Sequence, residues 1–143
     1  MQTNKITFNI HRASFLLDRI ADRALQDKFA LTYAQFRILM AIDSKKNLSQ
    51  KDIASFWEVS EAAVSRQLEN LKGKALIACQ EDRQNRRKNV LALTQKGREQ
   101  LLKSYKLISQ RYQDIYKVID AKTQDQLVGN LEKLVDSACF CSK

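Results

Sequence analysis

The chain has 143 residues, 44% of them hydrophobic, which is enough for one compact domain over residues 1–143 and too little for two separate cores. Its formal net charge of +9 favours an acidic partner such as nucleic acid. No apolar run is long enough to cross a bilayer, and no signal-peptide core follows Met1, so we expect a cytoplasmic protein with no membrane partner. Proline is absent and glycine is scarce, which favours long helices and a mainly α fold.

The N-terminal segment predicts an amphipathic helix. Its apolar residues recur at steps of three and four, the spacing of one helix packed lengthwise on another. The stripe consists of Ile6, Ile10, Ala13, Leu17, Ile20 and Ala24, widened by Phe15, Leu16 and Leu25. A helix with such a stripe needs an apolar surface to cover it.

Three shorter helices are predicted next, each begun by a hydroxyl residue. Thr32 caps a scaffold helix, whose inward residues are Phe36, Leu39, Met40 and Ile42. Ser49, with Asp52 three residues later, resembles a capping box for a short helix that ends at Phe56. After a turn through residues 57–59, Ser60 caps the third helix, whose inward stripe is Val64, Leu68 and Leu71.

The outward face of the Ser60-capped helix suits a DNA groove. It carries Glu61, Ala62, Ser65, Arg66 and Glu69. Small side chains beside polar ones allow a helix to approach base edges closely. Taken alone, an ordinary solvated face is the simpler interpretation, and the neighbouring elements favour the recognition helix.

A hairpin is predicted after that helix, with strands over residues 76–80 and 89–93 and a loop over 81–88. The loop carries four cations, Arg83, Arg86, Arg87 and Lys88. Like charges repel one another at a hairpin tip, so the cluster does not stabilise the fold. It suits a phosphate backbone or a narrow minor groove, where cations displace condensed counterions.

The C-terminal part predicts two further amphipathic helices, the first capped by Thr94. The stripes are Leu101, Tyr105, Ile108, Tyr112, Ile115 and Ile119, and then Leu127, Leu131, Leu134 and Ala138. The central module is too small to cover three amphipathic helices. A homodimer would cover them, and an intramolecular three-helix bundle is the alternative.

The order of these elements, together with four sequence stretches, resembles the MarR family of bacterial transcription regulators. The stretches are residues 31–39, residues 48–54, Val64-Ser65-Arg66 with Leu68 and Leu71, and Arg86-Arg87 followed by residues 90–97. The resemblance implies a winged helix-turn-helix over 31–97, flanked by dimerisation helices over 1–30 and 98–143. It also implies a homodimeric repressor on a roughly palindromic DNA operator, released by a small effector or an oxidant.

The resemblance and the pattern together give a set of candidate DNA contacts. We expect Ser60, Glu61, Ala62, Ser65, Arg66 and Gln67 at the major groove, Ser49 and Gln50 at phosphates, and Arg83, Arg86, Arg87 and Lys88 in the wing. The competing hypothesis is a winged-helix protein-interaction module that uses the same face to dock another protein.

The chain departs from the family pattern at three positions. Ala75 stands where the family often has glycine, at a cost of about 1 kcal/mol if a left-handed backbone is still required there, unless Gly73 shifts the helix end. Asn85 replaces a wing aspartate, for which Asp82 could substitute, and Cys79 replaces a basic residue.

Residues outside the DNA-binding face suggest weaker hypotheses. A third hypothesis is a ligand-binding carrier, in which Phe15, Tyr33, Phe36 and Tyr105 line a ligand cleft between the helical and winged parts, although such residues are more often plain core. Cys79, Cys139 and Cys141 are redox candidates, with tolerated thiols as the commoner case. The single histidine, His11, argues against a metal site, and we expect no cofactor. No phosphate loop or nucleophile elbow is present, so we do not expect an enzyme.

Overall fold

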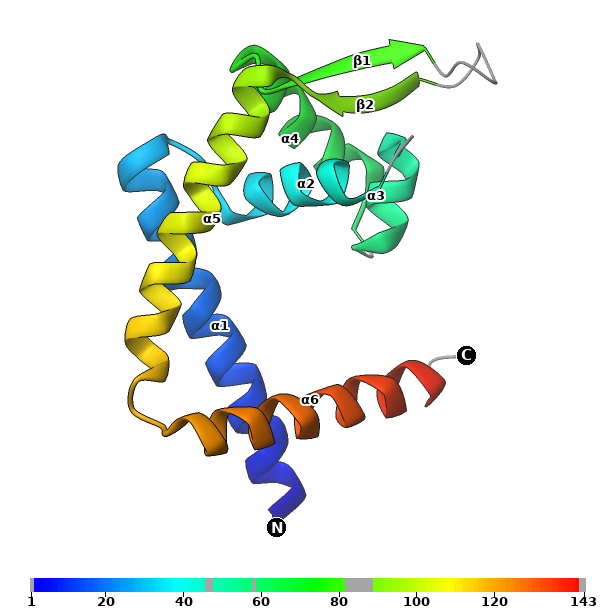
Figure 1. The fold of residues 1–143 in the computed structure, drawn as a ribbon. Coiled ribbons are helices and arrows are strands. Elements are labelled where there is room, and N and C mark those ends of the chain that lie inside the picture. The colour runs from blue at the N-terminus through cyan, green and yellow to red at the C-terminus, as the bar shows by residue number, and fades with distance from the viewer. Residues whose placement is uncertain (1, 46–47, 58, 82–88, 142–143) are drawn as a thin grey trace. The chain divides into compact units, whose positions relative to one another are not determined.

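The computed structural model describes residues 2–45, 48–57, 59–81 and 89–141, which form six helices and one antiparallel pair of strands (Figure 1). In chain order the elements are α1 (Gln2–Phe29), α2 (Tyr33–Ser44), α3 (Gln50–Phe56), α4 (Glu61–Gly73), β1 (Ile77–Glu81), β2 (Asn89–Leu93), α5 (Gln95–Tyr116) and α6 (Ala121–Cys141). The mainly α fold with a small hairpin is confirmed. The first strand begins one residue later than predicted, because Leu76 takes part in ending α4.

The chain forms two compact units, residues 1–109 and residues 110–143, and each is described by itself. A single domain over residues 1–143 therefore stays a prediction. None of the described helices is long and apolar enough to cross a membrane.

The core of the first unit draws on nearly all of its elements. Its largest fully buried apolar side chains are Leu25, Leu31, Leu39, Ile53 and Leu71. Each such side chain stabilises the fold by about 1.5 to 3 kcal/mol relative to an exposed position. The inward residues predicted for α2 and α4 are buried here, except Met40, which is half-buried.

The predicted caps of α2, α3 and α4 are confirmed. Thr32 and Ser49 each form a capping box, with Gln35 and Asp52 as the residues that reach back. The Ser60 hydroxyl accepts from the backbone N–H of Ala63 at 3.2 Å. These side chains satisfy amide donors that a helix leaves unpaired at its start.

α4 ends in a left-handed residue at Ala75, whose φ is 56°. The Ala75 N–H donates to the Lys72 carbonyl at 2.8 Å, and the Leu76 N–H donates to the Leu71 carbonyl at 3.0 Å, the two bonds of a Schellman motif. The left-handed backbone is thus retained without glycine. Gly73 does not shift the helix end, since it remains the last residue of α4.

The start of α5 packs tightly against that corner. Thr94 caps α5, because its hydroxyl oxygen accepts the Gly97 N–H at 2.9 Å, and its own N–H donates to the Leu76 carbonyl at 3.1 Å. A Cβ atom on Gly97 would lie 1.9 Å from the Leu76 carbonyl oxygen. Only glycine allows this approach.

The hairpin pairs Ile77 with Leu93 and Cys79 with Leu91, so it is in register over the described strands. β2 has a second backbone neighbour. The Leu91 N–H donates to the Leu48 carbonyl at 2.9 Å, which joins the strand to the residue before the Ser49 cap of α3. Figure 1 shows the two strands running beside each other next to α4.

In the second unit, the chain turns between α5 and α6 around Asp120. The Asp120 carboxylate accepts from the Thr123 backbone N–H at 3.1 Å and from the Thr123 hydroxyl at 2.6 Å, which caps α6. The Gln124 side-chain amide donates to the carbonyls of Tyr116 and Ile119 at the preceding helix end. The break between the two predicted C-terminal helices is therefore confirmed, and it is held by local hydrogen bonds.

Candidate nucleic-acid interface

α3 and α4 form the two helices of a helix-turn-helix. The Gln50 side-chain amide on α3 donates to the Glu61 carbonyl at the start of α4, at 3.2 Å. In the connection, the Val59 N–H donates to the Ala54 carbonyl at 3.1 Å. The inner face of α4 is buried through Val64 and Leu68, which fixes the side it presents outward.

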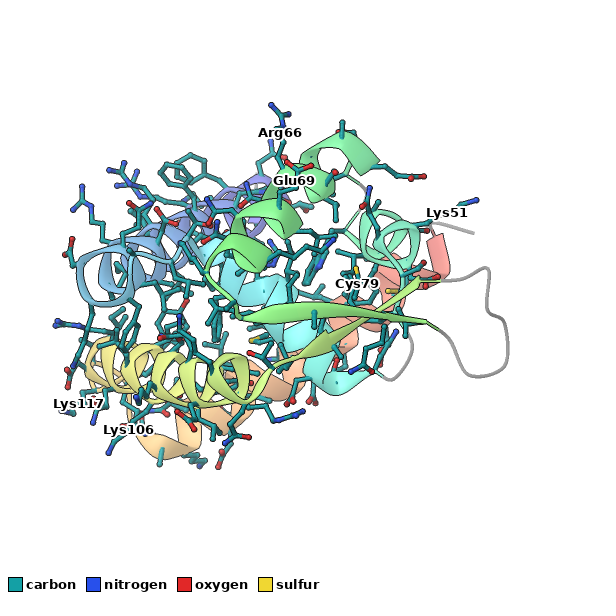
Figure 2. All side chains as sticks on the ribbon, turned by 90° about the horizontal axis from the view of Figure 1, so that it is seen from above. Lys51, Arg66, Glu69, Cys79, Lys106 and Lys117 are labelled. Atoms are coloured by element: carbon teal, nitrogen blue, oxygen red, sulfur yellow. The ribbon has the colours of Figure 1, made fainter. Side chains whose placement is uncertain are left out.

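The outward face of α4 is polar and accessible. Glu61, Ala62, Arg66 and Glu69 are exposed, and Ser65 is half-buried. Figure 2 shows the side chains of Arg66 and Glu69 extending from α4 toward the outside of the molecule. The helix therefore presents small side chains, a hydroxyl and a guanidinium on one surface, a combination suited to base edges in a major groove.

Two residues predicted to contact phosphate are engaged within the fold. The Ser49 hydroxyl donates to the Asp52 carboxylate at 2.6 Å, and Gln50 is the residue that reaches Glu61. Lys51, the next residue of α3, is exposed and points outward in Figure 2. Sequence reasoning did not select Lys51, although a cation in the first turn of the preceding helix was a signal for a phosphate contact.

Gln67 is turned toward α2 rather than along the outward face. Its side-chain oxygen accepts from the Gln35 side-chain amide at 3.1 Å, and the residue is only half-buried. Gln35 itself is buried, and the sequence pattern does not single it out as a site residue. Its signal in the sequence was a polar residue on the apolar face of the scaffold helix, in step with Leu39 and Ile42.

The wing cations lie outside the described residues. These are Arg83, Arg86, Arg87 and Lys88, together with Asp82 and Asn85. The strands that carry the wing are described, and Cys79 on β1 is exposed (Figure 2). In the chain, residues 82–88 lie between β1 and β2, and β2 is bonded through Leu91 to Leu48, the residue before the Ser49 cap of α3.

A cavity of about 760 Å³ lies in the first unit, between α2, α3 and α5. Its lining includes Met40, Phe56, Trp57, Leu102 and Tyr105. Of the four aromatic residues predicted to form a cleft, Tyr105 lines this cavity. Tyr33 stacks on Phe36, which is buried and meets the edge of Tyr105, whereas Phe15 is 59% exposed on α1. The aromatic set is therefore divided between core, surface and cavity.

One side of that cavity is lined by stacked charged and aromatic groups. The Arg37 guanidinium lies 3.5 Å from the centroid of the Trp57 ring, and Phe56 meets Trp57 edge to face at 4.8 Å. Contacts of this kind are worth about 0.5 to 2 kcal/mol each. They hold the end of α3 against α2.

The described cysteines form no disulfide bond. Cys79 and Cys139 are both free and exposed, and the side chain of Cys141 lies outside the described part of the chain. A redox role for Cys79, Cys139 and Cys141 stays a prediction. No group of three or more metal-binding side chains converges within the described ranges.

A buried scaffold helix, a helix-turn-helix and a paired hairpin in this order define a winged helix-turn-helix protein. The model of the MarR family matches residues 31–88. The winged helix-turn-helix of this chain is therefore similar to that of the MarR family over those residues. A comparison with curated protein sequences gave no match.

Several solved structures share the fold over most of both chains. MarR from E. coli, in its apo form, superimposes with a TM-score of 0.80 at 22% identity, over 90% of this chain and 95% of that one. The repressor CouR, bound to a 23-mer DNA duplex, gives 0.77 at 25% identity over 90% and 91%. MepR from S. aureus, in complex with DNA, gives 0.75 at 24% identity over 92% and 95%. The chain therefore shares the fold of these three proteins, two of which are solved with DNA.

Proposed function

We propose that this protein is a homodimeric repressor that binds a roughly palindromic DNA operator in the cytoplasm. The observation that carries the proposal is the exposed polar face of α4 around Arg66, presented by a buried opposite face in a fold whose solved relatives include DNA complexes. α4 would lie in the major groove, and the Arg86 loop would reach phosphate or the minor groove.

The apolar residues that remain exposed support the homodimer. Most of them lie on α1, α5 and α6, among them Ile6, Ile10, Phe15, Leu16, Leu102, Leu127, Leu131, Leu134 and Val135. Soluble monomers rarely expose this many large apolar side chains along helical stripes. A second copy would cover them and would present two α4 helices to two half-sites about one helical turn of DNA apart.

Selection of bound fragments from random DNA tests the proposal most directly. We expect enrichment of an inverted repeat, because a two-fold symmetric dimer reads the same half-site twice. Binding to the promoter region of its own operon, measured by gel shift, provides the second test. Absence of any sequence preference would contradict the repressor and favour the protein-interaction module.

Two alanine variants separate the recognition helix from the wing. Arg66→Ala should change which operators are preferred, whereas Arg86→Ala should weaken binding to all sequences and reduce the slope of log affinity against log salt by about one. Lys133→Ala on α6 removes an exposed cation outside the proposed DNA contacts and serves as the control. Equal binding by Arg86→Ala and wild type at all salt concentrations would contradict the wing assignment.

We further propose that a small apolar effector releases the DNA by occupying the 760 Å³ cavity. Its largely apolar lining and its place against the end of α3 support this proposal, because an occupant there would press on the helix-turn-helix. Met40→Trp should fill part of the cavity and abolish release by any effector found in a screen. Unchanged release by that variant would contradict the site.

A further inference from the structure

Gln35 is a buried polar side chain in an otherwise apolar interface between α2 and α4. It is 4% exposed, and its neighbours on the same face of α2 are Leu39 and Ile42. A buried amide costs free energy unless its donors and acceptors are all bonded. Its bonding partners therefore explain what it does.

All four hydrogen-bonding positions of the Gln35 amide are used. Its nitrogen donates to the side-chain oxygens of Gln67 and Asn70 on α4, at 3.1 Å each. Its oxygen accepts from the Thr32 backbone N–H at 3.2 Å and from Lys74 Nζ at 3.4 Å. A carboxamide offers two donors and two acceptor positions, so the group is fully satisfied.

The network connects α4 to the end of α1 as well as to α2. Lys74 Nζ, just after α4, also donates to the Ala30 carbonyl, just after α1. The Tyr33 N–H at the start of α2 donates to the Asp22 carboxylate on α1 at 2.8 Å. The start of α2, which carries Gln35, is therefore bonded to α1, and the residue that follows α4 is bonded to the residue that follows α1.

Directional bonds at this place control the rotation of α4. The apolar contacts of Val64, Leu68 and Leu71 are not directional, so they tolerate a small rotation of the helix about its axis. Gln67 and Asn70 are about one turn apart, and two bonds to them fix both rotation and sliding. Arg66 is adjacent to Gln67, so any rotation moves its guanidinium along the outward face.

We propose that Gln35 is a positioning residue that sets the orientation of the recognition helix and thereby the operator specificity of the protein. This inference rests on the proposed DNA-binding function. Gln35 touches no DNA in this proposal, and its effect passes through Gln67 and Asn70. Loss of the amide should lower specific binding and leave phosphate-driven, non-specific binding unchanged.

The test compares Gln35→Leu with wild type on the selected operator and on a scrambled duplex at the same salt concentration. We expect operator affinity to fall at least tenfold and affinity for scrambled DNA to change less than twofold, measured where unfolding curves show both proteins folded. The control is Gln95→Leu, which removes an exposed amide that donates to Glu99 at 3.0 Å on α5. An unchanged ratio of the two affinities would overturn the inference, and lack of operator preference in wild type would overturn the proposed function with it.

A second variant keeps the test decisive if Gln35→Leu does not fold. Asn70→Ala removes one of the two bonds to α4 at an exposed residue, and should lower the ratio of specific to non-specific affinity severalfold. In the absence of DNA, amide resonances of residues 61–73 should shift in this variant, while those of α6 stay in place. A variant with unchanged α4 resonances and an unchanged affinity ratio would contradict the positioning role.

Discussion

At Gly97 the fold leaves no space for a side chain, because α5 starts directly against the corner that ends α4. A Cβ atom there would lie 1.9 Å from the backbone oxygen of Leu76. A carbonyl in a Schellman corner cannot retreat without breaking the bonds of Leu76 and Thr94. The glycine is thus required by a close backbone approach and not by a positive φ.

Gly97→Ala should destabilise the protein by about 3 kcal/mol or more, since backbone would have to move. Chemical unfolding followed by circular dichroism measures the loss. Gly73→Ala is the matched control, because its added Cβ meets nothing within 4 Å and alanine favours a helix. Similar stabilities for the two variants would show that the α4 to α5 corner is looser than described.

Ala75→Gly should stabilise the protein by up to about 1 kcal/mol. Alanine at a φ of 56° is strained, and glycine adopts the left-handed region freely, although the unfolded chain gains some entropy in return. Ala30→Gly, at a φ of 51° after α1, should act in the same direction. A lower midpoint of chemical unfolding for both variants would mean that the strain is relieved elsewhere.

The helix starts could be predicted because their signals are local, whereas the sequence left open whether Ala75 keeps a left-handed backbone or Gly73 shifts the helix end. Thr32, Ser49 and Ser60 each act on a backbone amide within three residues, so spacing in the sequence was sufficient. The role of Gln35 could not be predicted in this way. Its partner Gln67 is 32 residues distant in sequence, and only the packing of α2 on α4 brings the two together.

For the elements, the hairpin and the helix-turn-helix were predictable to within one residue, whereas their contacts were not. Ser49 and Gln50 carried the right residue types for phosphate, but in the fold they serve the cap and the α3 to α4 connection. A serine or glutamine side chain can bind either a phosphate or another group in the fold. Its role can be assigned only when its partners within the fold are known. Lys51 has the exposure that phosphate binding needs.

The N-terminus of α6 should be sensitive to acid through Asp120. Hydrogen bonds from the Thr123 hydroxyl and then from its backbone N–H hold the pKa of Asp120 below its ordinary value of 3.8. A lowered pKa in the folded state means that this carboxylate stabilises α6 above that value, and that the contribution disappears as pH falls through the folded pKa.

Asp120→Asn should flatten this acid dependence, since asparagine caps a helix without titrating. The measurement is the difference in thermal midpoint between wild type and variant, followed from neutral pH to below 3.8. We expect the two proteins to differ little at the acid end and wild type to be the more stable at neutral pH. A difference that is independent of pH would contradict the role of the charge.

For the whole molecule, α6 shows why a dimer is proposed. None of its described side chains is buried, yet Leu127, Leu131 and Leu134 continue one apolar stripe. The sequence predicted the apolar stripes of all three flanking helices. It did not determine which surface packs against each stripe. Fold class was therefore predictable from periodicity, whereas the partner of each stripe was not.

Leu131→Lys should weaken the homodimer, because it places a charge in the centre of the α6 stripe. Light scattering after size exclusion should show a shift toward monomer, and operator affinity should fall more than tenfold as the second half-site is lost. Asn130→Lys adds the same charge at the neighbouring exposed position and should leave both measurements unchanged. A wild-type protein that is monomeric at micromolar concentration would contradict the dimer itself.

The hydrogen bond from the Leu91 amide to the Leu48 carbonyl has a mechanical consequence. It links the second strand of the hairpin to the segment leading into α3 through backbone atoms, so we expect a displacement of that strand to reach the helix-turn-helix. A duplex that bends toward the wing would therefore carry α3 along with it. On curved DNA we therefore expect β2 and α3 to tilt together.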